Sequence, residues 1–149
     1  MTSIRRSALV PYSAREMYQL VADIESYPQF LPWCSGARII SRDQEHAVAS
    51  IDIAYHRIGK TFTTRNRLQP DEFMEVCLVE GPFKHLHGFW RFEALAARSS
   101  RISLHLEFDF ASRMLALTLG PVFSSIANSL VDNFSRRAVD LYGEHEWEV

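Results

Sequence analysis

The sequence has few cysteines, no long apolar run and no repeats. Its two cysteines, Cys34 and Cys77, are too few for a disulfide framework and form no C-x-x-C pair, which favours a reduced, cytoplasmic setting. No apolar stretch approaches the roughly 20 residues of a membrane span, and the N-terminus lacks the apolar core of a signal peptide. We therefore expect a soluble protein whose only membrane contact is peripheral.

The net charge is also small. The 16 basic and 18 acidic residues give a formal charge of −2 at pH 7, which argues against broad electrostatic binding to nucleic acid and excludes DNA as an expected partner. A local basic patch remains compatible with this balance. The 149 residues, 47% of them hydrophobic and 23% charged, predict one globular domain over 1–149 with a proper core.

The longest helical pattern runs from about residue 121 to 142. Over its roughly 33 Å it can cross a small domain. Before it, residues 114–119 form an apolar segment that ends at Gly120-Pro121. Proline inside a helix removes a hydrogen bond and clashes with the preceding turn, so we expect a kink or break there, with 114–119 as a separate short element. The apolar positions with the spacing of one helix face are Phe123, Ile126, Ala127, Leu130, Phe134, Ala138 and Leu141.

The first 32 residues predict a strand and two short helices. Apolar residues between 4 and 10 suggest a strand that stops at Pro11. Ser13 followed three residues later by Glu16 has the capping-box pattern, which predicts a helix from there to about residue 24. A second short helix is expected near 27–31, ended by Pro32.

From Trp33 to Phe110 the apolar period is two, which predicts strands. Residues from Ala47 to His56 alternate, 58–60 read as a hairpin turn, and further strands are expected near 62–68, 73–79, from about 85, and 101–110. Such short connections imply antiparallel neighbours. The natural arrangement is a curved sheet around one long helix.

This order of elements resembles the helix-grip fold of the START and birch-pollen-allergen superfamily. The resemblance implies an α+β fold: a curved seven-stranded antiparallel sheet around a long C-terminal helix, with two short helices between strands 1 and 2. Residues 27–34, Tyr-Pro-Gln-Phe-Leu-Pro-Trp-Cys, resemble the signature of the coenzyme-Q-binding family, which includes bacterial ribosome-association toxins. Segments 62–66, 81–84, 88–92 and 120–123 match in the same order.

The resemblance implies a hydrophobic cavity between sheet and helix that holds a quinone or similar lipid, without a catalytic cofactor. Ala49 is small where a filled core favours larger residues, and Thr64 and Asn66 share a face with apolar neighbours, as in pockets for amphipathic ligands. A plain core would fit these residue types equally well; the resemblance favours the cavity. The predicted ligand-binding residues are Trp33, Ala49, Phe62, Thr64, Asn66, Phe83, Trp90, Phe92, Phe108, Phe123, Leu130 and Phe134.

Catalysis and metal binding are not expected. The acid and base candidates alternate with apolar residues along two strands, so they point to solvent if the apolar face points inward. His85 and His87 have no spaced cysteine or acidic partner of the kind zinc requires, so we predict no metal site. The acid and base candidates are His87, Glu93, His105, Glu107 and Asp109.

Two functions remain. The preferred hypothesis is non-enzymatic binding of ubiquinone or another polyprenyl quinone in support of respiratory quinone function. The alternative is a regulator that binds a ribosomal subunit and blocks subunit joining.

Each hypothesis predicts a different binding surface. The cavity entrance is expected where segments 30–33, 81–84 and 114–119 meet, with Lys84 and Arg113 beside apolar residues that could touch the inner membrane. The candidates for ribosomal RNA contact are Arg65, Arg67, Arg136 and Arg137.

Overall fold

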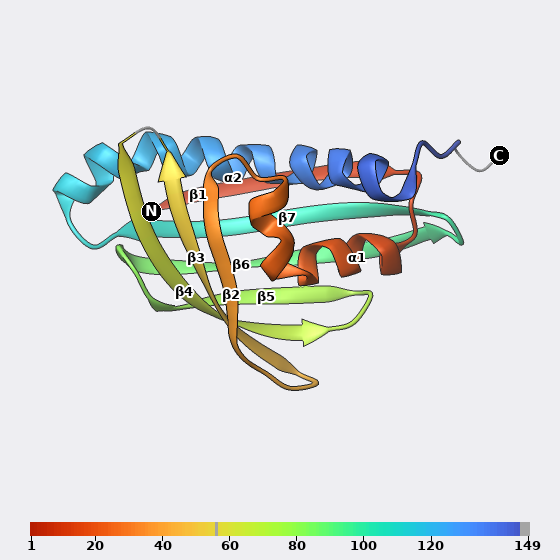
Figure 1. The fold of residues 1–149 in the computed structure, drawn as a ribbon, viewed down its shortest axis with the longest axis horizontal. Coiled ribbons are helices and arrows are strands. Elements are labelled where there is room, and N and C mark those ends of the chain that lie inside the picture. The colour runs from red at the N-terminus through yellow and green to blue at the C-terminus, as the bar shows by residue number, and fades with distance from the viewer. Residues whose placement is uncertain (56, 147–149) are drawn as a thin grey trace.

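The computed structural model describes residues 1–55 and 57–146; His56, the last residue of the predicted alternation, and residues 147–149 lie outside the described part. The α+β fold class is confirmed: a seven-stranded sheet curves around one long helix (Figure 1). The elements in chain order are β1 (Thr2–Val10), α1 (Ala14–Ala22), the 3₁₀ helix η1 (Ile24–Gln29), β2 (Cys34–Arg42), β3 (His46–Tyr55), β4 (Ile58–Gln69), β5 (Phe73–Glu80), β6 (Phe83–Ala96), β7 (Ser99–Phe110) and α2 (Arg113–Tyr142).

The strand order is β1-β7-β6-β5-β4-β3-β2, and every pair of neighbours is antiparallel. The six strands from β2 to β7 each pair with the next strand in sequence, and β1 pairs with the last strand, β7. In Figure 1, α2 lies along β1 and β7, while β2, β3 and β4 run across at a steep angle. The sheet therefore has an inner face toward α2 and an outer face toward solvent.

Burial along the strands separates these two faces. On β4, Thr64 and Asn66 are buried whereas Arg65 and Arg67 are exposed. On β7, every second residue from Ile102 to Phe110 is buried, as the sequence predicted. This alternation puts the apolar residues of the sheet against α2 and places the charged ones outside.

The start of each N-terminal helix is set by hydrogen bonds between residues that are close in sequence. Ser13 Oγ accepts from the Glu16 N–H at 3.1 Å, and Glu16 Oε1 accepts from the Ser13 N–H at 3.0 Å, which confirms the capping box. The second short helix spans Ile24–Gln29 rather than the predicted 27–31. It begins earlier because the Ser26 N–H already bonds to the Asp23 carbonyl at the end of α1.

The predicted break at Pro121 is wrong, because α2 is one helix from Arg113 to Tyr142. Pro121 lies on the exposed side, where water can bond the carbonyl that loses its helical partner. Leu119 and Phe123, on either side of it, are buried and hold both halves against the sheet. The predicted stripe also needs one correction: Leu141 is 53% exposed, while Val131 is buried.

Among the helices in the described ranges, α2 alone is long and apolar enough to cross a membrane, judged by length and composition. This corrects the expectation that no segment reaches that length. The helix packs on β1, β7 and α1 and buries Phe123, Ala127 and Phe134. The core helix of a soluble protein passes the same test of length and composition.

Two strand boundaries differ from the prediction. Ile58, Gly59 and Lys60 belong to β4 and pair with Tyr55, Ala54 and Ile53 instead of forming the hairpin turn. Gly59 itself pairs with Ala54, so the ladder continues through that position. Strand β6 begins at Phe83, two residues before the expected start.

Candidate functional site

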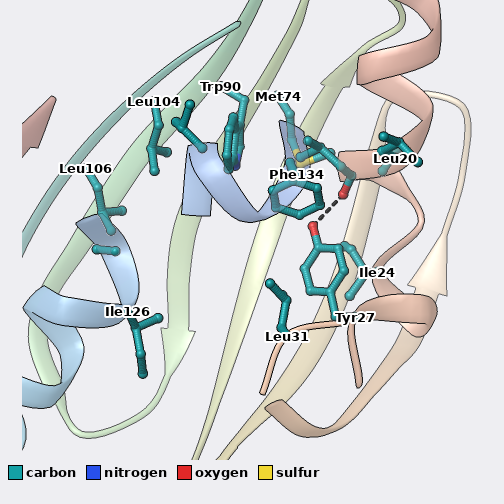
Figure 2. Close-up of a cluster of buried hydrophobic side chains, with 14 of the residues drawn as sticks. Leu20, Ile24, Tyr27, Leu31, Met74, Trp90, Leu104, Leu106, Ile126 and Phe134 are labelled. Atoms are coloured by element: carbon teal, nitrogen blue, oxygen red, sulfur yellow. Dashed lines mark hydrogen bonds between the residues drawn. The ribbon is translucent and has the colours of Figure 1, made fainter. Parts of the chain in front are cut away.

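A small apolar cavity of about 90 Å³ lies between the inner face of the sheet and α2. Figure 2 shows Leu104, Leu106 and Trp90 from the sheet facing Ile126 and Phe134 from α2. Ligand pockets usually measure roughly 300–1,000 Å³, so a quinone ring with its tail requires the wall to open further. The cavity is lined mainly by Ile24, Tyr27, Trp33, Ile51, Phe62, Thr64, Asn66, Met74, Val76, Leu86, Gly88, Trp90, Leu104, Leu106, Phe123, Ile126, Ala127, Leu130 and Phe134.

Gly88 lines the cavity with backbone atoms only, because it has no side chain. A Cβ atom at this position would lie 2.4 Å from the carbonyl oxygen of His105 and 2.8 Å from Leu106 Cδ1. Only glycine therefore lets β6 approach β7 this closely.

Two polar side chains of β4 face the cavity. Thr64 Oγ1 donates to Asn66 Oδ1 at 2.9 Å, and Asn66 Nδ2 lies 3.8 Å from Met74 Sδ. Sulfur is a weak acceptor, so the Asn66 amide retains donor capacity toward the cavity. This pair can orient one polar group of a mainly apolar ligand.

Trp33 carries an unsatisfied donor at the same cavity. Its side chain is 7% exposed, and Nε1 is buried without a hydrogen-bond partner among the described residues. Leaving a buried donor unpaired costs about 1–3 kcal/mol. A carbonyl or ether oxygen of a ligand would supply the missing acceptor.

Tyr27 lines the cavity and is buried. Its hydroxyl donates to the Val21 carbonyl, the dashed bond in Figure 2, and its ring meets Phe134 edge to face at 5.4 Å. Burial raises the pKa of Tyr27 far above its usual value, so the hydroxyl stays protonated. Its role is to anchor η1 against α2.

Eight of the twelve predicted ligand-binding residues line this cavity: Trp33, Phe62, Thr64, Asn66, Trp90, Phe123, Leu130 and Phe134. Their role in binding a ligand remains a prediction.

The other four predicted residues are buried elsewhere in the core, which corrects their placement on the wall. Ala49 is 1% exposed and lies on β3 opposite Thr64 of β4. Phe83 stacks on the Phe110 ring, and Phe92 packs edge to face on Tyr18. Phe108 contacts the Phe83 ring in the same aromatic cluster.

Several wall residues were not predicted. Met74 and Val76 follow the inner-face alternation of β5, which could have identified them. Ile24 and Tyr27 come from η1, and no sequence period shows that this helix reaches the cavity.

The acid and base candidates lie on the outer face, as expected, and outside the cavity wall. Glu93 pairs with Arg101 at 3.5 Å, and His105 with Glu107 at 3.5 Å. The geometry thus gives the cavity no acid or base pair from these strands.

The expected entrance segments differ in exposure. Trp33 and Phe83 are buried. By contrast, Met114 and Leu117 at the start of α2 are 75% and 74% exposed, next to the exposed Arg113.

Aromatic and basic side chains gather on the outer face of β1, β4, β5, β6 and β7. The rings of Phe73 and Phe89 stack with centroids 5.4 Å apart. The Arg67 guanidinium lies 5.2 Å from the Phe73 centroid and that of Arg91 lies 5.7 Å from the Phe89 centroid. His105 meets Phe89 edge to face at 5.2 Å. We call this surface the aromatic–arginine face; it comprises Arg5, Arg67, Phe73, Phe89, Arg91 and His105.

One carboxylate lies within this surface. Glu75 accepts from Arg67 Nε at 3.2 Å and lies 3.1 Å from His87 Nε2. The hydrogen bond from His87, and then that from Arg67, hold the pKa of Glu75 below its usual value. Its negative charge is therefore locally compensated.

The four arginines predicted to contact RNA do not form one patch. Arg65 and Arg67 lie on the outer face of the sheet, whereas Arg136 and Arg137 belong to α2, which covers the inner face. Arg137 is also engaged locally, since Nη2 donates to Gln29 Oε1 at 3.0 Å and the guanidinium lies 4.8 Å from the Phe30 centroid.

Comparison with known proteins identifies relatives over nearly the whole chain. Residues 10–135 match the family model described as polyketide cyclase / dehydrase and lipid transport. The chain is 46% identical to ribosome association toxin RatA of Escherichia coli K12 over 95% of this chain and 90% of that protein. It is 44% identical to the protein of the same name from Pseudomonas aeruginosa, over 95% and 99% of the two chains.

A more distant relative is the mitochondrial coenzyme Q-binding protein COQ10 homolog B of Xenopus laevis. It is 25% identical over 94% of this chain and 59% of that protein. The names of these relatives refer to ribosome association or to coenzyme Q binding.

Two solved structures share the fold. The Zhui aromatase/cyclase from Streptomyces sp. R1128 has a TM-score of 0.81 at 18% identity, over 97% of this chain and 99% of that one. An 18 kDa protein from Caulobacter crescentus has a TM-score of 0.74 at 30% identity, over 97% and 100%. At 18% identity the cyclase establishes only a common fold.

Proposed function

Because the chain belongs to the polyketide cyclase / dehydrase and lipid transport family, and its relatives at 44–46% identity are named ribosome association toxins, we propose that it binds a ribosomal subunit and blocks subunit joining. It acts without catalysis, as a single domain over 1–149, in the cytoplasm. This reverses the order of the two hypotheses drawn from the sequence. Relatives named for ribosome association reach 46% identity, whereas the relative named for coenzyme Q binding is 25% identical.

The observation that carries this proposal is the aromatic–arginine face. Proteins bind unpaired RNA bases by stacking them on aromatic rings and guanidinium planes, often on the open face of an antiparallel sheet. Phe73 and Phe89 are half-buried and already aligned by stacking, so they offer ring surface at little cost in conformational entropy. Arg91 and Arg5 are exposed beside them and can reach phosphates.

A shallow groove beside Phe89 suits a nucleic-acid strand. Arg5, Arg6 and Ser7 of β1 form one side of it, and Ser103 and His105 of β7 form its floor. No acidic side chain lines this groove within the described ranges. The groove on the other side of the stack, beside Phe73, is lined by Asp71, Glu72 and Glu93 as well as by Arg67 and Arg91. The strand should therefore lie on the Arg5 side.

Binding to purified ribosomal subunits tests the proposal. The protein is incubated with each isolated subunit and sedimented over a range of salt concentrations. We expect one subunit to retain it and the affinity to fall steeply with salt, since phosphate contacts release counterions. Replacing Arg5 or Arg91 by Gln should each reduce the slope of log K against log salt by about one. Arg98→Gln, in the β6–β7 turn, is the matched control and should leave the slope unchanged.

A second candidate function is the binding of a lipophilic molecule such as ubiquinone in the cavity. The unpaired Trp33 Nε1 and the Thr64–Asn66 pair favour it, because each offers polar capacity inside an apolar wall. The relative named for coenzyme Q binding adds support. Burial of apolar ligand surface would contribute about 25 cal/mol per Å².

The start of α2 provides a route for such a ligand. Met114 and Leu117 are exposed beside Arg113, a pairing suited to peripheral contact with an anionic inner membrane. Titration with a short-chain ubiquinone, followed by tryptophan fluorescence, tests this candidate. Saturable quenching that is insensitive to salt is expected from apolar burial. Val76→Phe, which fills the cavity, should abolish it.

A further inference from the structure

Three potential metal ligands converge on the outer face of β5 and β6. Glu75 and Cys77 are two residues apart on β5, so their side chains share a face, and Cys77 is paired directly with His87 on β6. One carboxylate oxygen, the thiol sulfur and one imidazole nitrogen all lie within 4.8 Å of one another. All three residues are half-buried, and Cys77 is a free thiol.

The spacing already approaches that of a tetrahedral zinc site. With zinc–nitrogen and zinc–oxygen bonds of about 2.0–2.1 Å, two ligand atoms at tetrahedral positions lie about 3.3 Å apart. Glu75 Oε2 and His87 Nε2 are 3.1 Å apart. The Cys77 sulfur lies within 4.8 Å of both atoms, so metal binding requires it to move closer by rotation of its side chain.

The neighbouring arginine holds the carboxylate in place. Arg67 Nε donates to Glu75 Oε1, which leaves Oε2 directed at His87, where a metal ion would replace the proton that the two atoms share. Partners of this kind, which fix the orientation of a metal-binding side chain, are typical of protein metal sites. The charges also balance, since a divalent cation would be neutralised by the Glu75 carboxylate and the Cys77 thiolate.

We propose that Glu75, Cys77 and His87 bind a divalent transition metal of the zinc class at the surface of the sheet, with water in the fourth position. A mixed oxygen, sulfur and nitrogen set selects zinc over magnesium or calcium, which require oxygen ligands. The sequence did not suggest this site because it paired His87 with His85 as the possible metal ligands. His85 does not belong to the cluster.

Cobalt(II) serves as a spectroscopic probe of this site in the metal-free protein. We expect one equivalent to bind, with intense visible bands of tetrahedral geometry and a sulfur-to-cobalt charge-transfer band in the near ultraviolet. Cys77→Ser should remove the charge-transfer band. Zinc affinity, measured against a chromophoric chelator, should fall by roughly tenfold or more in Glu75→Gln and His87→Gln, because even partners outside the ligand set contribute that much.

Two matched controls use residues outside the cluster. Cys34→Ser removes the other thiol, and His85→Gln removes another histidine of β6; both should bind cobalt and zinc like the original protein. A second measurement needs no variant: zinc should slow alkylation of Cys77, located by peptide mass spectrometry, by at least tenfold. Absence of saturable binding would overturn the proposal, as would a thiolate band that persists in Cys77→Ser or alkylation of Cys77 at an unchanged rate.

Discussion

Phe73 and Phe89 stack across β5 and β6 on the outer face of the sheet, with ring centroids 5.4 Å apart and planes inclined by 25°. They are not directly opposite each other: Phe73 pairs with Arg91, and Phe89 pairs with Glu75. The contact is thus diagonal, and an arginine lies over each ring. Both rings are partly exposed on the sheet surface. Part of their apolar surface therefore stays in contact with water unless a partner covers it.

The first prediction concerns this stack. Phe89→Ala should weaken binding to the ribosomal subunit by about 1–3 kcal/mol, which corresponds to the loss of one stacked base. Leu95→Ala is the matched control, since Leu95 is an exposed apolar residue of the same strand outside the aromatic–arginine face. Sedimentation of each variant with purified subunits gives the affinities. Equal losses for the two variants would indicate that general apolar contact, rather than stacking, binds the partner.

The second prediction concerns the centre of the core. Phe134→Ala should lower the free energy of unfolding by about 3–5 kcal/mol, because the ring is buried among Tyr27, Phe30 and Trp90 and its removal enlarges the cavity. Urea titration gives the value. Arg136→Ala, exposed two residues along α2, should stay within about 0.5 kcal/mol of the original protein. A loss below 1 kcal/mol for Phe134→Ala would contradict the packing described.

The third prediction concerns the proline inside α2. Pro121→Ala should raise the free energy of unfolding by up to about 3 kcal/mol, because alanine restores a helical hydrogen bond and removes a clash at an exposed position. Ser125→Ala, an exposed site of the same helix, is the reference for the gain from alanine alone. A Pro121 variant less stable than the original protein would mean that α2 needs the proline.

The fourth prediction contrasts two buried polar groups at the cavity. Tyr27→Phe should destabilise the protein by about 1–3 kcal/mol, because the Val21 carbonyl loses its partner. Trp33→Phe removes a donor that is already unpaired, so its cost comes only from the smaller ring, and quinone affinity should fall. Thermal unfolding and fluorescence titration give the two quantities. Unchanged quinone affinity in Trp33→Phe would show that Nε1 does not bind the ligand.

Sequence patterns predicted the sheet well because burial on one face imposes a period of two. Ile102, Leu104 and Leu106 alternate strictly, and the strand they define is present. The capping box at Ser13 was predictable for a similar reason, since it depends on only four consecutive residues. Features fixed by contacts between neighbouring residues in sequence are thus visible in the sequence.

Other features depend on contacts that no local pattern records. Pro121 is tolerated because buried residues on both sides hold α2 to the sheet, so packing overrides helix propensity. Ala49 was placed at the cavity because it is small, but it is buried outside the cavity wall. The Phe73–Phe89 stack and the Glu75–Cys77–His87 cluster each require the register of β5 against β6, which only the structure provides.

The most direct test of the central claim is the joining of purified small and large ribosomal subunits, followed by light scattering as magnesium is raised. The original protein should reduce the yield of joined ribosomes in proportion to its concentration. A variant carrying both Phe89→Ala and Arg91→Gln should lose this effect, while Leu95→Ala should retain it. Subunits that join equally well with and without the original protein would contradict the proposed function.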